Sequence, residues 1–97
     1  MDAKIDFLFR KKLYEGKIFV DGSELPCLVF VILYDQELEE EFGDEITLKT
    51  DFEKLLLGKN DYKALAELKE AIFSIARNTA PFVAVKEKWA SLTPNKN

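Results

Sequence analysis

Short runs of β-branched and aromatic residues occupy the first third of the chain. Residues 4–10 and 17–20 are two such runs, and the Asp-Gly pair at 21–22 is typical of hairpin turns. A longer apolar run covers residues 27–34. The pattern predicts a hairpin of 17–20 with 27–34 and a further strand near 4–10. Pro26 is expected at a strand start or a sheet edge, because proline has no amide hydrogen to donate.

Residues 28–33 form the central strand of this predicted sheet. They are apolar without interruption, so both faces of the strand need cover. The strand at 4–10 repeats this feature, since Leu8 lies on the face opposite Ile5, Phe7 and Phe9. Either helices of the chain cover both faces of the sheet, or a second subunit covers one of them.

Two short elements are expected after the apolar strand. Leu38 and Phe42 are four residues apart, which predicts a helix over 35–42 with Gly43 just past its end. Residues 46–49 alternate between apolar and polar side chains and predict a strand. Thr50 and Glu53 then have capping-box spacing, which predicts a helix over 51–57 that stops at Gly58.

Two longer helices are expected in the last third of the chain. Asn60 or Asp61 caps the first, whose apolar stripe at helical spacing consists of Leu65, Leu68, Ile72, Ile75 and Ala76. Pro81 ends that helix and opens another over 81–92. Its inner stripe consists of Phe82, Val85, Trp89 and Leu92. Residues 93–97 are expected to be a frayed tail.

The order of these elements predicts the fold class. Strands come first and helices follow, which favours an α+β fold with a small, mostly antiparallel sheet of three or four strands. Two or three C-terminal helices are expected to pack against it. The 97 residues suffice for a hydrophobic core without a disulfide or a metal. They contain no repeat or linker, so residues 1–97 are expected to form one domain.

Charge is distributed very unevenly along this domain. The net charge is −4, yet residues 1–34 carry five basic and five acidic side chains, and residues 46–97 carry nine basic and six acidic ones. Residues 35–45, here called the acidic segment, hold seven acidic side chains and no basic one. These are Asp35, Glu37, Glu39, Glu40, Glu41, Asp44 and Glu45. The segment is either a solvated surface or a site that docks a basic partner. Mimicry of nucleic-acid phosphate is one form of such docking.

The composition excludes several common kinds of catalytic site. Without histidine there is no Ser-His or Cys-His nucleophile pair and no imidazole zinc site. Cys27 is the single cysteine and is expected to be a buried thiol that behaves as a small hydrophobic side chain. The four glycines are isolated, so no phosphate-binding loop is expected, and we expect no cofactor. We therefore expect no catalytic residues.

Carboxylates provide the one route to a metal site. The spacing from Asp35 to Glu41 is similar to the start of an EF-hand loop, but Glu40 replaces the required glycine and Ile46 replaces the final glutamate. Glu67 and Lys69 have the acid-x-lysine spacing of metal-dependent nucleases, although they lie in a periodic helix. A carboxylate-based, divalent-metal-dependent enzyme or ligand-binding domain is therefore an alternative, and no particular metal ligands are expected.

A basic cluster offers a second alternative. Arg10, Lys11, Lys12 and Lys17 lie near Tyr14 and Phe19, and interleaved cations and aromatic rings can stack single-stranded nucleic acid. The sequence pI is about 4.9, whereas nucleic-acid-binding domains are commonly basic. Charge at a strand end, or pairing with the acidic segment, is the simpler interpretation.

A binding protein is the function that the sequence favours. We expect a non-enzymatic, regulatory or accessory protein that docks an unidentified, basic protein partner through the acidic segment. We also expect a homodimer, formed through the sheet face or through the C-terminal helix with Phe82 and Trp89. The N-terminus lacks the features of a secretory signal, and the run 28–33 is too short to cross a bilayer, so we expect a cytoplasmic protein without membrane contact.

Overall fold

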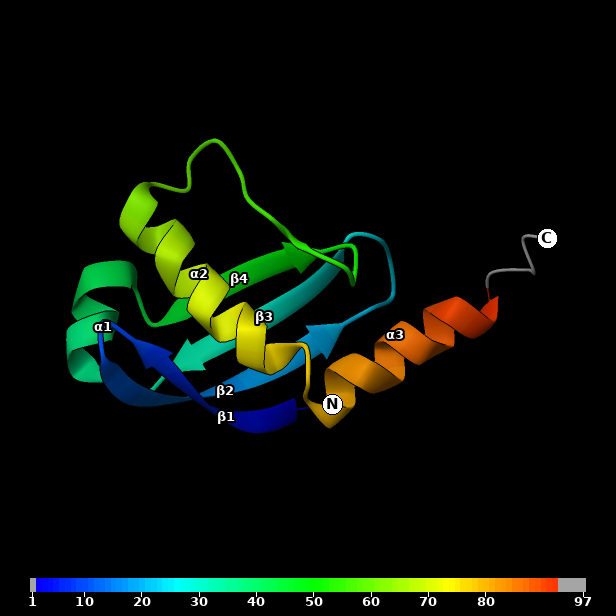
Figure 1. Cartoon of the computed structure of the whole chain (residues 1–97), viewed down its shortest axis with the longest axis horizontal. Coiled ribbons are helices and arrows are strands. Elements are labelled where there is room, and N and C mark those ends of the chain that lie inside the picture. Colours follow the sequence, from blue (N-terminus) through cyan, green and yellow to red (C-terminus); the bar gives the residue numbers. More distant parts are fainter. Residues whose placement is uncertain (1, 93–97) are drawn as a thin grey trace.

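One antiparallel sheet forms the body of the protein. The computed structural model describes residues 2–92, and in this part of the chain each strand pairs with the next one in sequence, in the order β1-β2-β3-β4-β5 (Figure 1). The strands are β1 (Asp2–Phe9), β2 (Lys12–Asp21), β3 (Cys27–Leu33), β4 (Glu45–Thr50) and β5 (Leu55–Leu56). The predicted hairpin and the central position of the apolar strand are both confirmed.

Three helices complete the α+β fold. They are α1 (Gln36–Phe42), α2 (Lys63–Ala76) and α3 (Ala80–Leu92). Figure 1 shows α2 lying across one face of the sheet, α1 at one end, and α3 extending beyond the opposite end. No helix within residues 2–92 has the length and the apolar character needed to span a membrane.

The core lies between the sheet and α2. Alternate side chains of each strand point inward, and these include Phe7, Ile18, Val31 and Leu48, all of which are fully buried. Leu68, Ile72, Phe73 and Ala76 of α2 cover them. Phe82 of α3 closes the core, with its ring edge-on to those of Phe52 and Phe73. The expected burial of Phe82 is thus confirmed.

β1 and β2 are joined by a tight turn. Arg10 and Lys11 both have positive φ, at 53° and 63°, as a two-residue hairpin turn matched to the strand twist requires. The strand therefore ends at Phe9 rather than at Arg10. β2 is longer than the predicted 17–20 because Gly16 continues the ladder, and a Cβ there would lie only 2.9 Å from the carbonyl oxygen of Ile32.

The predicted helix over 51–57 is wrong. The Thr50 hydroxyl donates to the Lys54 carbonyl at 2.6 Å and accepts from the Phe52 amide at 2.9 Å. The Asp51 carboxylate accepts from the amides of residues 53 and 54. These side chains therefore stabilise a turn, in competition with a helix. The turn directs Leu55–Leu56 back along β4 as a fifth strand, one more than the predicted maximum of four.

The apolar stripes of the last two helices differ in part from the prediction. Ile75 is 37% exposed, and Phe73 takes the buried position instead. Leu92 was expected on the inner stripe but is 63% exposed, because α3 has passed the edge of the sheet by its last turn. Asp61 does not cap α2, which begins after Tyr62 without a side-chain cap. The expected tail at 93–97 lies outside the described residues.

Candidate functional site

α1 displays most of the acidic segment. Asp35 caps the helix, since its Oδ1 accepts from the Leu38 amide at 3.0 Å, and Gly43 follows the last turn with a φ of 89°. Leu38 is buried in the core, and Phe42 packs against Phe9 with a ring separation of 6.0 Å. The predicted helix is confirmed. Its apolar side chains fix it to the sheet, and its acidic side chains face outward.

One carboxylate of the acidic segment is bound to a cation. Both guanidinium nitrogens of Arg10 donate to the Glu41 carboxylate at 2.8 Å, from 31 residues away in sequence. This bond lowers the pKa of Glu41 and raises that of Arg10. Arg10 also lies over the rings of Phe9 and Phe42, at 4.7 and 5.7 Å. The expected pairing of the basic cluster with the acidic segment is therefore confirmed for Arg10.

Five of the seven carboxylates of the segment are exposed to solvent. Glu40 accepts a bond from the Gln36 amide, and within residues 2–92 no ion pair joins the segment to any cation except Arg10. The exposed carboxylates are Glu37, Glu40, Glu41, Asp44 and Glu45. Asp35 has a structural role and Glu39 is half-buried, so the seven predicted residues lie together but are not equivalent.

The basic cluster is divided by the structure. Arg10 turns toward α1, whereas Lys17 lies 3.2 Å from the Asp2 carboxylate and 5.4 Å from the ring of Phe19. Lys12 lies over the ring of Tyr14 at 5.3 Å. The Tyr14 ring is itself buried between strands. Of the two aromatic rings of this cluster, that of Tyr14 is therefore buried, whereas that of Phe19 is half-buried and lies beside Lys17.

Among residues 2–92 no group of three or more acidic or cysteine side chains is arranged to hold a metal ion. Cys27 is fully buried, as predicted, and burial raises the pKa of its thiol to about 11. The thiol is therefore protonated and poorly nucleophilic at neutral pH.

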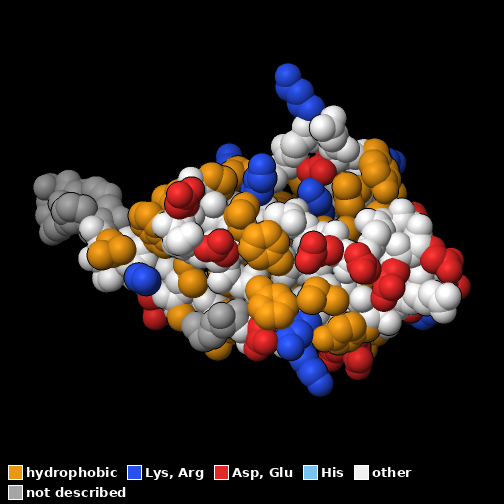
Figure 2. All heavy atoms as spheres, turned by 180° about the vertical axis from the view of Figure 1, so that it is seen from behind, with side chains coloured by type: hydrophobic (Ala, Val, Ile, Leu, Met, Phe, Trp, Pro, Cys, Tyr) orange, Lys and Arg blue, Asp and Glu red, His pale blue; other side chains and the backbone are white. Residues whose placement is uncertain are grey.

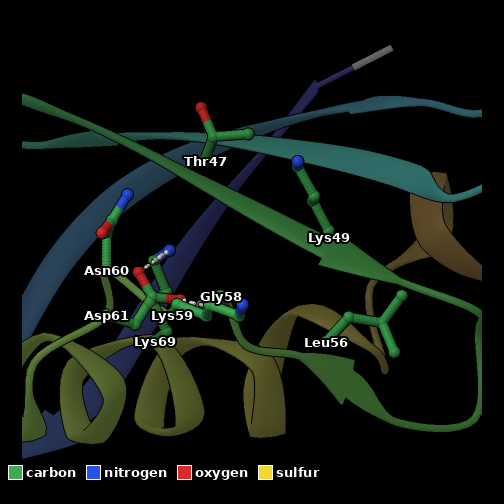
Figure 3. A pocket seen from close by; sticks show the side chains of 8 residues that line it. All are labelled: Thr47, Lys49, Leu56, Gly58, Lys59, Asn60, Asp61 and Lys69. Atoms are coloured by element: carbon green, nitrogen blue, oxygen red, sulfur yellow. Dashed lines mark hydrogen bonds and ion pairs between the residues drawn. The ribbon is translucent and has the colours of Figure 1, made fainter.

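A small cleft lies between β4 and the loop that leads into α2. It has a volume of about 310 Å³ and is lined by Lys49, Lys59 and Lys69 among others. Figure 3 shows Asp61 joined both to Lys69, at 2.9 Å, and to the backbone amide of Gly58, at 2.8 Å. These bonds lower the pKa of Asp61. Asp61 thus neutralises one of the three lysines and closes the loop.

Within residues 2–92, no helix covers the second face of the sheet. We call it the open face. Its side chains are Asp2, Lys4, Asp6, Leu8, Leu13, Glu15, Lys17, Phe19, Asp21, Leu28, Phe30, Ile32, Glu45, Thr47, Lys49 and Leu56. Figure 2 shows this side of the molecule, with hydrophobic side chains across its middle and acidic side chains gathered at the end where α1 lies. The sequence predicted either helices of this chain on both faces of the sheet or a second subunit on one face. Within residues 2–92 the helices cover one face only.

Some of these surface residues were not identified from the sequence. Residues 12–16 were not assigned to a strand, so the position of Leu13 and Glu15 beside Leu8 and Asp6 was not expected. The alternation of polar Glu15 and Lys17 with Tyr14, Gly16 and Ile18 is the signal that was available. Searches with family models, among curated proteins and among solved structures found no match to this chain.

Proposed function

We propose that this protein acts by binding rather than by catalysis, and that a basic protein docks on its acidic segment. The proposal rests mainly on the exposed carboxylates of α1 and of the loop that follows it. Arg10 forms an ion pair with Glu41 and with no other carboxylate of this set. Closely spaced like charges repel one another, so a basic partner would gain energy by relieving this repulsion. A regulatory or accessory protein fits this property.

The rigid attachment of α1 supports this proposal. Leu38 and Phe42 hold the helix on the sheet, and Asp35 and Gly43 define its two ends. Glu37 and Glu40 are therefore presented by a preformed helix, so little ordering entropy is lost when a partner binds. Asp44 and Glu45 extend the same charge into β4.

Self-association is a second part of the proposal. The two surfaces expected for a homodimer are the open face and α3. On α3 the indole of Trp89 is already used within the chain, donating to the Gly22 carbonyl at 2.7 Å. The open face instead exposes Leu8 and Leu13 to 64% and 65%. We therefore propose the open face, rather than α3, as the dimer contact.

Charge reversal at the displayed carboxylates tests the docking proposal. The variant E37K/E40K/D44K leaves the cap at Asp35 and the Arg10–Glu41 pair in place. We expect it to lose a protein that the unaltered chain captures from a lysate of its native cells. The captured protein is then purified and titrated, and its affinity for the unaltered chain is expected to fall as salt rises.

A matched variant controls for net charge. E67K/E70K/E87K makes the same change in charge at exposed positions on α2 and α3. We expect this variant to retain the partner. Circular dichroism and thermal melting confirm that both variants fold. Equal loss of the partner in both variants, or in neither, contradicts docking on the acidic segment.

A further inference from the structure

The open face carries charges in rows that run across the strands. Lys4 and Lys17 lie opposite each other in the pairing of β1 with β2, and the next outward pair along these strands is Asp6 with Glu15. A cationic row therefore adjoins an anionic row. Outward residues of one strand are about 7 Å apart, so the two rows are separate bands of opposite sign.

Apolar side chains border these rows. On one side Phe19 lies opposite Phe30 in the pairing of β2 with β3, and on the other side Leu8 lies opposite Leu13. Along β2 the order is thus Phe19, Lys17, Glu15, Leu13, whereas along β1 it is Asp2, Lys4, Asp6, Leu8, because Asp2 lies opposite Phe19. The centre of this order, a cationic row beside an anionic row, is complementary to its own reverse, and on β2 an apolar side chain borders it at each end.

From this order we infer that the open face binds a second copy of the same chain, with the strands of the two sheets running in opposite directions. The inference deepens the proposed self-association and does not involve docking on α1. Each sheet would form one layer of an aligned β-sandwich, in which facing sheets pack about 10 Å apart. The two-fold axis lies between the sheets, crosses the strands, and passes over Gly16.

This axis matches unlike groups across the interface. Lys17 of one copy meets Glu15 of the other, Lys4 meets Asp6, and the Phe19 ring meets Leu13. Asp2, which lies opposite Phe19, meets Leu8 at the edge strand, and its bond to the Lys17 ammonium of its own chain keeps this carboxylate paired. Position 16, which lies under the axis, belongs to the core face, where a Cβ would meet the Ile32 carbonyl and the Phe7 ring, so no side chain from it enters the interface.

The alternative two-fold axis is disfavoured by charge. An axis parallel to the strands would lay each row on the same row of the second copy. Lys17 would then face lysines and Glu15 would face carboxylates, and like charges in contact destabilise an interface. The rows therefore select antiparallel stacking, and the apolar side chains supply the area that is removed from water.

Reciprocal charge reversal tests this arrangement. In variant K4E/K17E both rows are acidic, and in variant D6K/E15K both rows are basic. By sedimentation we expect the unaltered chain to have twice its 11.2 kDa mass. Each variant alone is expected to bind itself at least about tenfold more weakly, and an equimolar mixture of the two is expected to form a heterodimer.

Three results would overturn the inference. The first is an unaltered chain that stays monomeric from micromolar to millimolar concentration. The second is undiminished self-association of both variants, which would place the contact elsewhere, for example on α3. The third is a mixture that does not associate when both variants are folded by circular dichroism.

Two further variants keep this test independent of folding and of the proposed docking. Leu13→Asp alters a highly exposed side chain, so the fold is expected to tolerate it while the dimer dissociates. The α1 variant E37K/E40K/D44K is expected to remain dimeric. Loss of partner capture with an intact dimer, or the reverse, then shows which of the two proposals has failed.

Discussion

Trp89 donates its indole N–H to the carbonyl oxygen of Gly22 at 2.7 Å, across 67 residues of sequence. This bond holds α3 against the turn between β2 and β3. Val85, one turn earlier, occupies the space beside the Gly22 Cα, so that a Cβ at this position would overlap the valine side chain. Gly22 is therefore required by close packing.

Gly22→Ala is expected to destabilise the fold by about 1–3 kcal/mol, because the added methyl group displaces α3. Urea unfolding measures the loss, and fluorescence of Trp89, the only tryptophan, reports the displacement. The matched variant G22A/V85A removes the overlap, so its loss is expected to be smaller than the sum of the two single losses. Additive losses would contradict the packing of α3 on this turn.

Asp61 is expected to stabilise the loop before α2 in a pH-dependent manner. The Lys69 ammonium, followed by the Gly58 amide, lowers the pKa of Asp61, and both side chains of the ion pair are largely buried. A carboxylate whose pKa is lowered on folding contributes stability above its ordinary pKa and loses it as pH falls through the native value. Asp61→Asn should cost about 1–2 kcal/mol at neutral pH.

Thermal melting as a function of pH measures this contribution. The difference in Tm between the unaltered chain and Asp61→Asn is expected to shrink once the pH falls below the ordinary range of an aspartate. Glu67→Gln, at an exposed position of α2, serves as the control and is expected to have little effect. A difference that stays constant into acid would show that the ion pair with Lys69 contributes nothing.

The sequence predicts most of the fold because local and non-local preferences agree along most of the chain. Asp35, Leu38, Phe42 and Gly43 all favour the same short helix, and α1 forms there. At Thr50 the local signals are ambiguous, since the same hydroxyl can cap a helix or close a turn. The pairing of Leu55–Leu56 with β4 favours the turn over the helix. The residues around Thr50 do not by themselves indicate that pairing.

The candidate surfaces are predictable to different extents. The acidic segment is contiguous in sequence, so the order of residues alone reveals its position. Its bond to Arg10 depends on the β1–β2 turn lying beside α1, which only the fold provides. The rows of the open face likewise depend on register, because a shift of one residue would move Lys17 to the other face.

The residues of the acidic segment are expected to separate into structural and displayed groups. Asp35→Ala removes the cap on the Leu38 amide and should cost about 1 kcal/mol. Asp44→Ala removes an exposed carboxylate of the same segment and should leave stability unchanged within about 0.5 kcal/mol. Chemical denaturation measures both values. An equal cost for the two variants would contradict a capping role for Asp35.

Cys27 is expected to be protected from thiol reagents until the protein opens. The thiol is fully buried, and burial, with a smaller effect of Asp21, raises its pKa to about 11. Labelling by a chromogenic disulfide at neutral pH should therefore be slow and should accelerate with urea. As the control, C27A/L25C carries its thiol at an exposed position and is expected to react at once.

The raised pKa of Cys27 also implies that the thiol's contribution to stability is lost between pH 9 and about 11, because the unfolded state releases its proton first. The Tm of the unaltered chain, compared with that of Cys27→Ala, should therefore fall across this pH range. Rapid labelling of the native protein at neutral pH would contradict the burial of Cys27.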